Sequence, residues 1–168
     1  KAGNEAKCYR LKWRIATPQT ELRVGLQKIN FGPARLLRIL QWFDQINPQQ
    51  ISQTTNGVKA ALFRYTYLNN DNFWLWSILA DGNLKGNELF SSPKNSIEYG
   101  GRFQKAFLSG DAAFSCNWRK YQHLSASNWE GRFAIDARYD WVCAIWLEAM
   151  SQYYQGLTAV DSWRYSAT

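Results

Sequence analysis

The chain has little cysteine, histidine or methionine, and these scarcities limit the chemistry that it can perform. Its 168 residues include three cysteines, one histidine and one methionine. Cys8, Cys116 and Cys143 are odd in number and show no CxxC spacing, which predicts buried or semi-buried thiols. The alternative, one disulfide and one free thiol, requires an oxidising compartment. Three scattered cysteines and a lone His123 do not provide the ligands of a tetrahedral zinc site, so no metal is expected.

Long hydrophobic runs are also absent. A membrane-spanning helix needs about 20 predominantly apolar residues, and the longest candidates, residues 73–80 and 141–150, are too short. The sequence does not begin with a basic segment, an apolar segment and a small-residue cleavage site. We therefore expect no membrane span and a mature or cytosolic form, with a secreted or periplasmic location favoured over the cytoplasm.

Catalytic arrangements are equally sparse. Any Ser–His or Cys–His pair must use His123, and Cys116 lies too near it on the same expected strand or turn for the usual geometry. Glu130 and Asp136 have the residue types of a glycosidase pair, but only their presence supports that role. No glycine-rich phosphate cradle is found. The sequence favours binding over catalysis, with no catalytic residue assigned.

Positive charge is concentrated in the first third of the chain. Residues 1–57 contain nine Lys or Arg and three acids, a balance of +6, whereas residues 58–168 contain eleven and ten, a balance of +1. A basic segment attracts nucleic acid, anionic lipid or an acidic protein partner. The alternative is a solvated basic face that maintains solubility.

Alternating residues predict two strands near the beginning of the chain. In residues 8–15, Leu11, Trp13 and Ile15 face one side and basic residues face the other, which is the period of a half-buried strand. Residues 21–31 show a second alternation and predict a second strand. The two strands are separated by a Thr-Pro break.

A helix is expected next. Pro33 suits the first helical turn and Pro48 closes the element. Apolar residues between them recur at spacings of three and four: Leu36, Leu40, Phe43 and Ile46. Residues 47–57 are polar, uncharged and rich in turn formers, which indicates a linker.

From residue 58 onward, short aromatic strands alternate with turn signals. This pattern predicts a mainly β protein, an antiparallel up-and-down β-barrel in residues 58–168. Residues 1–57 would form a basic extension of two strands and one helix, packed on the barrel or completing it. The expected strands of the barrel are 61–68, 73–79, 101–107, 114–121, 131–137, 141–148 and 161–165.

Tryptophans recur through the last third of the chain, about one for each expected strand or strand end. Aromatic residues that face inward in a small barrel can enclose one apolar ligand. The alternative is that they are ordinary core residues. The four tryptophans are Trp118, Trp129, Trp146 and Trp163.

Several segments resemble the avidin and streptavidin family in consistent order over about residues 62–165. Residues 114–119 (FSCNWR) carry a Trp followed by a basic residue, and residues 125–133 (SASNWEGRF) place two hydroxyl residues before a Trp. The family's Trp-Leu and final Trp-Lys pairs are similar to residues 146–147 and 163–164. Its Asp-Gly hairpin and Gly-Arg-Tyr are similar to residues 80–86 and 101–103.

This resemblance implies a non-enzymatic barrel that binds biotin or a biotin-like small molecule without a cofactor, in a homo-oligomer. Trp118, Trp129 and Trp146 would wall the apolar pocket, and Trp163 would come from a neighbouring subunit. The resemblance also gives polar roles to Ser125, Ser127, Tyr67, Asp71 and Glu88. The last three stand nearest the family's Asn, Ser and Tyr donors, and two of them ionise to acceptors.

Two alternative functions are different from small-molecule binding. Residues 71–86 (DNFWLWSILADGNLKG) are similar to the helix of LAGLIDADG homing endonucleases, which implies a basic DNA-binding homodimer with a metal site at the paired Asp81 residues. The other alternative is a structural or interaction module with no small ligand, whose basic residues 1–57 dock an acidic partner.

Overall fold

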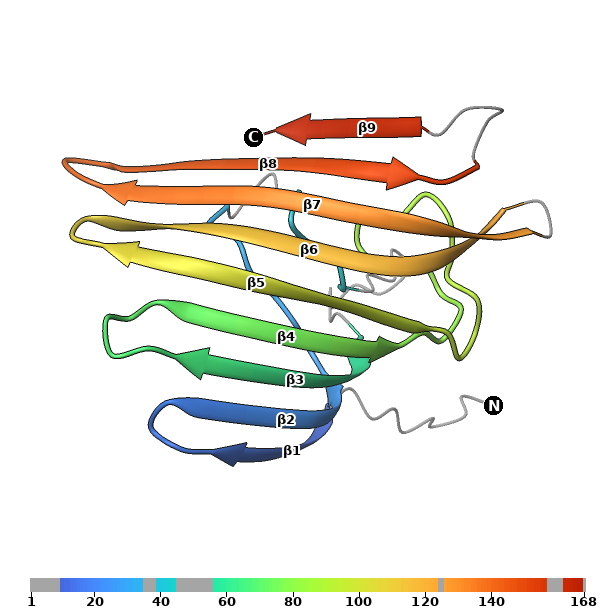
Figure 1. Ribbon diagram of the computed structural model, residues 1–168, viewed down its shortest axis with the longest axis horizontal. Coiled ribbons are helices and arrows are strands. Elements are labelled where there is room, and N and C mark those ends of the chain that lie inside the picture. The colour runs from blue at the N-terminus through green and yellow to red at the C-terminus, as the bar shows by residue number, and fades with distance from the viewer. Residues whose placement is uncertain (1–9, 35–38, 45–55, 124–125, 157–161, 168) are drawn as a thin grey trace, which may run out of the picture.

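Nine antiparallel strands form a single sheet in which each strand pairs with its neighbours in the sequence (Figure 1). The computed structural model describes residues 10–34, 39–44, 56–123, 126–156 and 162–167. The strands are β1 (Leu11–Ala16), β2 (Thr20–Gln27), β3 (Val58–Thr66), β4 (Asn72–Leu79), β5 (Ile97–Phe107), β6 (Gly110–His123), β7 (Ala126–Asp140), β8 (Ala144–Tyr154) and β9 (Ser162–Ala167).

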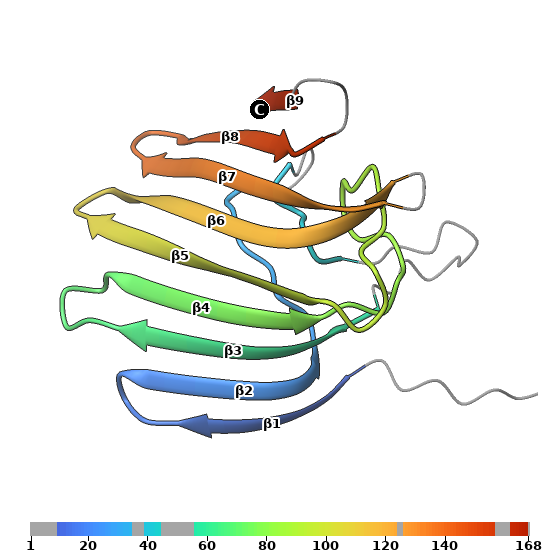
Figure 2. The ribbon, with the colours of Figure 1, turned by 45° about the vertical axis from the view of Figure 1, so that its right-hand side comes forward.

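The prediction of a mainly β, up-and-down architecture is confirmed, but the sheet is not closed. β1 and β9 lie at opposite edges of the sheet, as Figures 1 and 2 show. β2 pairs with β3 through all eight of its residues, so the expected extension and the expected barrel share one sheet. The strand expected over 141–148 begins at Ala144, because residues 141–143 form the turn after β7.

The two helices that the sequence suggested are wrong in the residues described. Within the helix expected between Pro33 and Pro48, residues 33–34 and 39–44 are not helical, and Leu36 and Ile46 lie outside the described residues. Residues 72–79 of the endonuclease-like segment form β4 instead of a helix. In the described part of the chain, no helix is long and apolar enough to cross a membrane.

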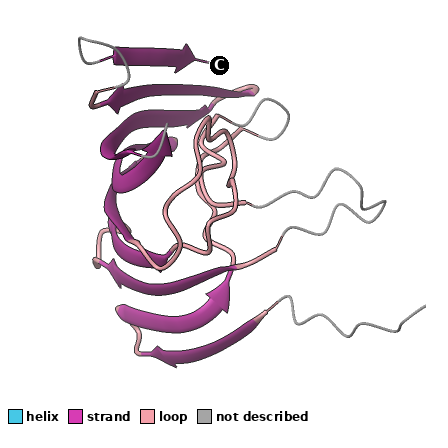
Figure 3. Ribbon diagram, turned by 90° about the vertical axis from the view of Figure 1, so that its right-hand side faces the viewer, coloured by secondary structure: helices cyan, strands magenta, loops and turns pink. Residues whose placement is uncertain are grey.

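The two faces of the sheet have different neighbours. The long connections after β2 and β4 gather on one side of the sheet, where residues 28–34, 39–44 and 80–96 pack against it (Figure 3). We call this side the covered face and the other side the open face. Most side chains in the middle of the covered face are buried along β3 to β8, whereas many large apolar side chains of the open face are exposed.

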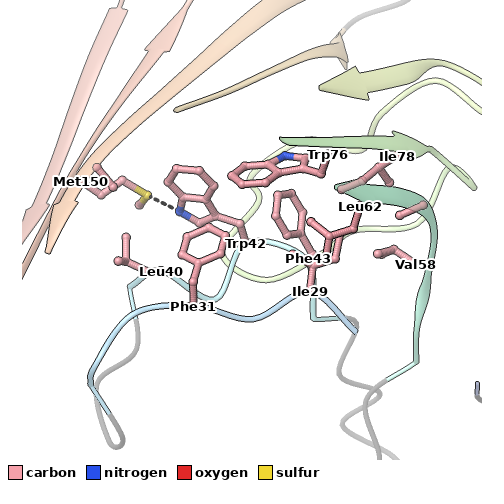
Figure 4. Close-up of a cluster of buried hydrophobic side chains, with 12 residues drawn as sticks. Ile29, Phe31, Leu40, Trp42, Phe43, Val58, Leu62, Trp76, Ile78 and Met150 are labelled. Carbon is pink, nitrogen blue, oxygen red and sulfur yellow. Dashed lines mark hydrogen bonds between the residues drawn. The ribbon is translucent and has the colours of Figure 1, made fainter. Parts of the chain in front are cut away.

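An aromatic cluster between the covered face and the first long connection forms the hydrophobic core (Figure 4). Phe31 stacks on Trp76 with ring centroids 5.5 Å apart, and the indole N–H of Trp42 donates to Met150 Sδ at 3.0 Å. Gly100 lies beside Trp76 on the neighbouring strand β5. Any side chain at this position would place its Cβ 2.8 Å from the Trp76 ring, so only glycine fits there. The first long connection therefore contacts both β4 and β8 on the covered face.

Candidate functional site: an apolar open face and an ionic covered face

The open face is apolar across the whole sheet. Register places Phe103 opposite Phe114, and Phe114 opposite Ile135, so that aromatic and aliphatic side chains continue from strand to strand. Leu75 is 46% exposed, Phe114 48% and Ile135 54%. Soluble monomeric proteins rarely expose a contiguous apolar patch larger than a few hundred Å². An apolar surface that covers adjacent strands of a nine-stranded sheet therefore indicates an interaction with an apolar partner.

Charged residues on the open face are confined to the ends of strands. Side chains alternate between faces along a strand, and in the described strands this places three charged residues on the open face: Lys59, Lys105 and Lys120. Each lies within four residues of a strand end. The ammonium of Lys120 lies 5.3 Å from the centre of the Trp129 ring. The middle of this face thus contains no ionised group in the described strands.

Aromatic side chains form a band near each end of the open face. Near the ends joined by short turns, the aromatic residues of the strands are Tyr65, Phe73, Phe107 and Tyr139. Near the opposite ends, Tyr99 is paired with Trp118, and Trp118 with Gly131. A Cβ at position 131 would lie 2.6 Å from the Trp118 ring, so the indole lies across this glycine. The second band continues through Trp129 and Tyr153.

The covered face carries a buried network of six ionised side chains. Arg132 Nε binds Glu130 Oε1 at 2.6 Å, and Arg119 forms an ion pair with the other oxygen of the same carboxylate. Glu88 reaches both arginines from the second long connection, with N–O distances of 3.3 Å to each. Three basic and three acidic side chains sum to zero when all are charged; burial raises the pKa of Glu88, and the neighbouring Arg132, Arg119 and Lys85 oppose that rise. The six residues are Lys85, Glu88, Glu98, Arg119, Glu130 and Arg132.

A second buried ion pair connects β5 to β7. The Arg102 guanidinium binds both oxygens of Asp136, at 2.5 and 2.8 Å, and donates to Ser115 Oγ at 3.0 Å. Its central carbon lies 5.2 Å from the Phe31 ring. Such a bidentate pair has a defined geometry and holds two side chains that are almost fully buried.

Comparisons with protein-family models, with curated proteins and with solved structures find no match to this chain. The avidin-like family and biotin as a ligand therefore stay predictions.

Of the tryptophans expected to wall the pocket, Trp118 and Trp129 lie on the opposite face of the sheet from Trp146. Trp118 and Trp129 lie on the open face, in the aromatic band at the loop ends of β6 and β7. Trp146 lies on the covered face near the start of β8, beside a cavity of about 580 Å³ that Pro33 also lines. The backbone of Trp163 pairs with Tyr153, and its side chain lies outside the described residues.

The polar residues of the expected pocket are also separated. Ser125 lies outside the described residues, and Ser127 is exposed at the start of β7. Tyr67 and Asp71 belong to the turn between β3 and β4, whereas Glu88 belongs to the ionic network of the covered face. Asp81 lies in the turn after β4, where its carboxylate accepts the backbone N–H of Asn83.

Asp71 connects the turn between β3 and β4 to the β5–β6 hairpin through hydrogen bonds. Its Oδ1 accepts the backbone N–H of Ala106 at 2.9 Å, and its Oδ2 accepts from the side chain of Asn69. The bond from Ala106 holds the pKa of Asp71 below its usual value, with smaller contributions from Asn69 and Lys105. Asp71 therefore has a structural role in the turn.

The catalytic pairs considered from the sequence are not assembled. Cys116 lies on the open face and His123 on the covered face, where His123 contacts Phe90 with ring centroids 4.8 Å apart. Glu130 and Asp136 both lie on the covered face, but each forms an ion pair with arginine. Cys116 and Cys143 are free thiols, and Cys8 lies outside the described residues.

The sequence analysis missed the ionic network, although β6 and β7 contain a signal for it. In β6, polar residues at every second position (Asn117, Arg119 and Tyr121) alternate with apolar residues or with residues near the strand end. In β7, Glu130 and Arg132 alternate with their neighbours in the same way. This alternation gives each strand a polar side with charged residues and an apolar side, but it does not say which side is enclosed. Lys85 and Glu88 carry no such pattern, because they belong to an irregular connection.

Proposed function

We propose that this sheet is the wall of a membrane-inserted β-barrel. The open face lies against lipid acyl chains, and the covered face surrounds an interior that holds both the aromatic core and the buried ion pairs and that the two long connections partly fill. The observation that carries this proposal is the exposed apolar surface that crosses the sheet while the buried face holds the ion pairs. In a water-soluble antiparallel sheet the uncovered face is polar, whereas here it is apolar.

The aromatic bands support a lipid partner in preference to a protein. Tyrosine and tryptophan prefer the boundary between the hydrocarbon and the polar head groups, and membrane barrels carry an aromatic girdle at both boundaries. The open face has this order, with aliphatic residues and phenylalanine between two bands that contain Tyr139 and Trp118. Lys105 and Lys120 stand near the ends, where a long side chain can reach water.

Strand lengths and connections fit the same interpretation. A membrane β-strand needs about 9 to 11 residues when tilted, and β5 to β8 contain 11, 14, 15 and 11 residues. β3 contains nine residues, whereas β1, β2, β4 and β9 are shorter, with 6, 8, 8 and 6 residues. Short turns at residues 17–19, 67–71, 108–109 and 141–143 join the strands at one end, whereas the two long connections leave from the other end, which also carries the two-residue link between β6 and β7 (Figure 1). Membrane barrels show this asymmetry between short turns and long loops.

Closure of the barrel is part of the proposal. Backbone N–H and C=O groups that face hydrocarbon must be paired, so an open sheet edge is not tolerated within a bilayer. β1 and β9 are the free edges of the described sheet. In the membrane they would pair with each other or with further strands.

Vesicle insertion tests the proposal. We expect the chain to fold into phosphatidylcholine vesicles, with its tryptophan fluorescence quenched by lipids brominated along the acyl chain. Phe114→Arg, in the middle of the open face, should destabilise the inserted form by about 2–4 kcal/mol. Lys120→Arg, near the end of the same strand, is the matched control and should change it little. A chain that folds equally well without lipid or detergent, or equal stability of both variants, would refute the proposal.

A further inference from the structure

Three arginines converge on one carboxylate at the β1–β3 side of the covered face. Glu21 accepts from Arg14 Nε through one oxygen, and from Arg23 Nη2 at 2.6 Å through the other. Arg64 Nη1 lies 3.5 Å from that second oxygen. The register sets this arrangement, because Arg14 is directly opposite Arg23, and Glu21 is directly opposite Arg64. The four charges sum to +2.

This excess of positive charge contrasts with the buried network described above, which is neutral. Like charges directly opposite each other across a strand pair are destabilising, so Arg14 and Arg23 are placed against the preference of the sheet. One carboxylate offers about four acceptor positions, whereas three guanidinium groups offer about 15 N–H donors. Most donors of the cluster therefore remain for a ligand or water.

Two of these donors are buried and have no hydrogen-bond partner in the described structure: Nε of Arg23 and Nε of Arg64. Buried polar groups are normally paired, so each exception needs an explanation. Arg64 is also fixed in orientation, because its guanidinium lies 4.1 Å from the centre of the Trp74 ring. The side chains remain reachable from water, with 58% of Arg14, 21% of Arg23 and 29% of Arg64 exposed.

We propose that Arg14, Arg23 and Arg64 form a binding site for a small, water-soluble molecule that carries a phosphate group. A phosphate monoester has a charge of about −1.5 to −2 at neutral pH, which matches the +2 of the cluster. Guanidinium groups present paired N–H donors that fit phosphate oxygens. The site lies on the covered face, opposite the proposed lipid surface, so its ligand reaches it from the aqueous interior. Glu21 orients the guanidinium groups and does not itself bind the phosphate.

Binding of inorganic phosphate to the full chain in zwitterionic detergent micelles tests this site separately from membrane insertion. Isothermal titration calorimetry should show one saturable site that weakens as sodium chloride is added. Arg64→Gln and Arg14→Gln should each weaken binding about tenfold, since each removes a charged hydrogen-bond donor group. Arg14 is mostly exposed, so its replacement does not disturb the fold.

Arg138→Gln is the matched control. Arg138 lies on the covered face too, but on β7, toward the β9 edge of the sheet. It is half exposed and has its own partner, Asp140, at 2.8 Å. We expect its replacement to leave phosphate affinity unchanged. The proposal would be overturned by the absence of saturable binding up to about 10 mM phosphate, which corresponds to a very weak site. It would also be overturned by equal affinity in Arg14→Gln, Arg138→Gln and the parent chain.

Discussion

Replacing Asp136 by alanine isolates the energetic role of the bidentate pair between β5 and β7. The change removes both acceptors at 2.5 and 2.8 Å from Arg102 and leaves its guanidinium with Ser115 Oγ at 3.0 Å. Arg102 is almost fully buried and cannot turn to water without disturbing the core around Phe31. Removing one partner of a buried ion pair costs about 3–5 kcal/mol. We expect Asp136→Ala to lower the free energy of unfolding by this amount.

Urea unfolding in detergent micelles, followed by tryptophan fluorescence, measures the loss. Asp140→Ala is the control, because the pair of Arg138 and Asp140 is half exposed and such surface pairs contribute about 0–1 kcal/mol. The double variant Arg102→Met with Asp136→Leu should recover most of the stability, since a buried pair replaced by apolar groups is often neutral.

A loss below about 1 kcal/mol in Asp136→Ala would refute this reasoning, because an unpaired buried guanidinium cannot cost so little. A double variant as unstable as the single one would also contradict it. That result would mean that the apolar side chains do not fit the space, so that packing and not charge sets the cost.

Three further expectations follow from single contacts. Gly131→Ala should displace the Trp118 indole and cost about 1–3 kcal/mol, with a changed near-ultraviolet circular dichroism spectrum; an unchanged spectrum would contradict it. Phe43→Ala should open a cavity in the core and cost about 3–5 kcal/mol in urea unfolding, and a loss under 1 kcal/mol would mean that the connection does not contribute to the core. The pKa of Asp71 is lowered in the folded protein, so its bond to Ala106 stabilises the fold at pH values above the carboxyl's ordinary pKa. This stabilisation is lost as the pH falls through the lowered pKa. Asp71→Asn should remove that part of the pH dependence of unfolding, and an unchanged pH profile would contradict the role.

Most strands could be predicted because their side chains alternate, as Leu11, Trp13 and Ile15 do in β1. The prediction that this strand is half-buried is wrong, because all six of its residues are exposed. The helix near Leu40 and Phe43 was predicted from the spacing of apolar residues between Pro33 and Pro48. In the structure these residues pack on the sheet from an irregular segment together with Trp42, which does not belong to the expected helical stripe. Tertiary packing there replaces the local preference, and a single-sequence pattern contains no information on that packing.

The candidate site was harder to predict, because the sequence does not say what lies against each face. Alternation identifies two sides of β6, and Trp118 was expected on the side that faces the inside of the barrel. The structure buries the other side, with Arg119, and exposes the side with Phe114. A search for continuous apolar runs also fails for strands of this kind, since only every second residue is apolar and no run of about 20 can occur.

The uninterrupted register from β1 to β9 has a consequence for how errors in assembly are rejected. Because successive side chains point in opposite directions, a slip of one residue in a single pairing would exchange the two surfaces of every strand beyond it. A slip between β6 and β7 would bring Arg132 to the side of Phe114 and leave Ile135 among the carboxylates. Such a product would be penalised on both surfaces at once, so this sheet tolerates very few wrong alignments.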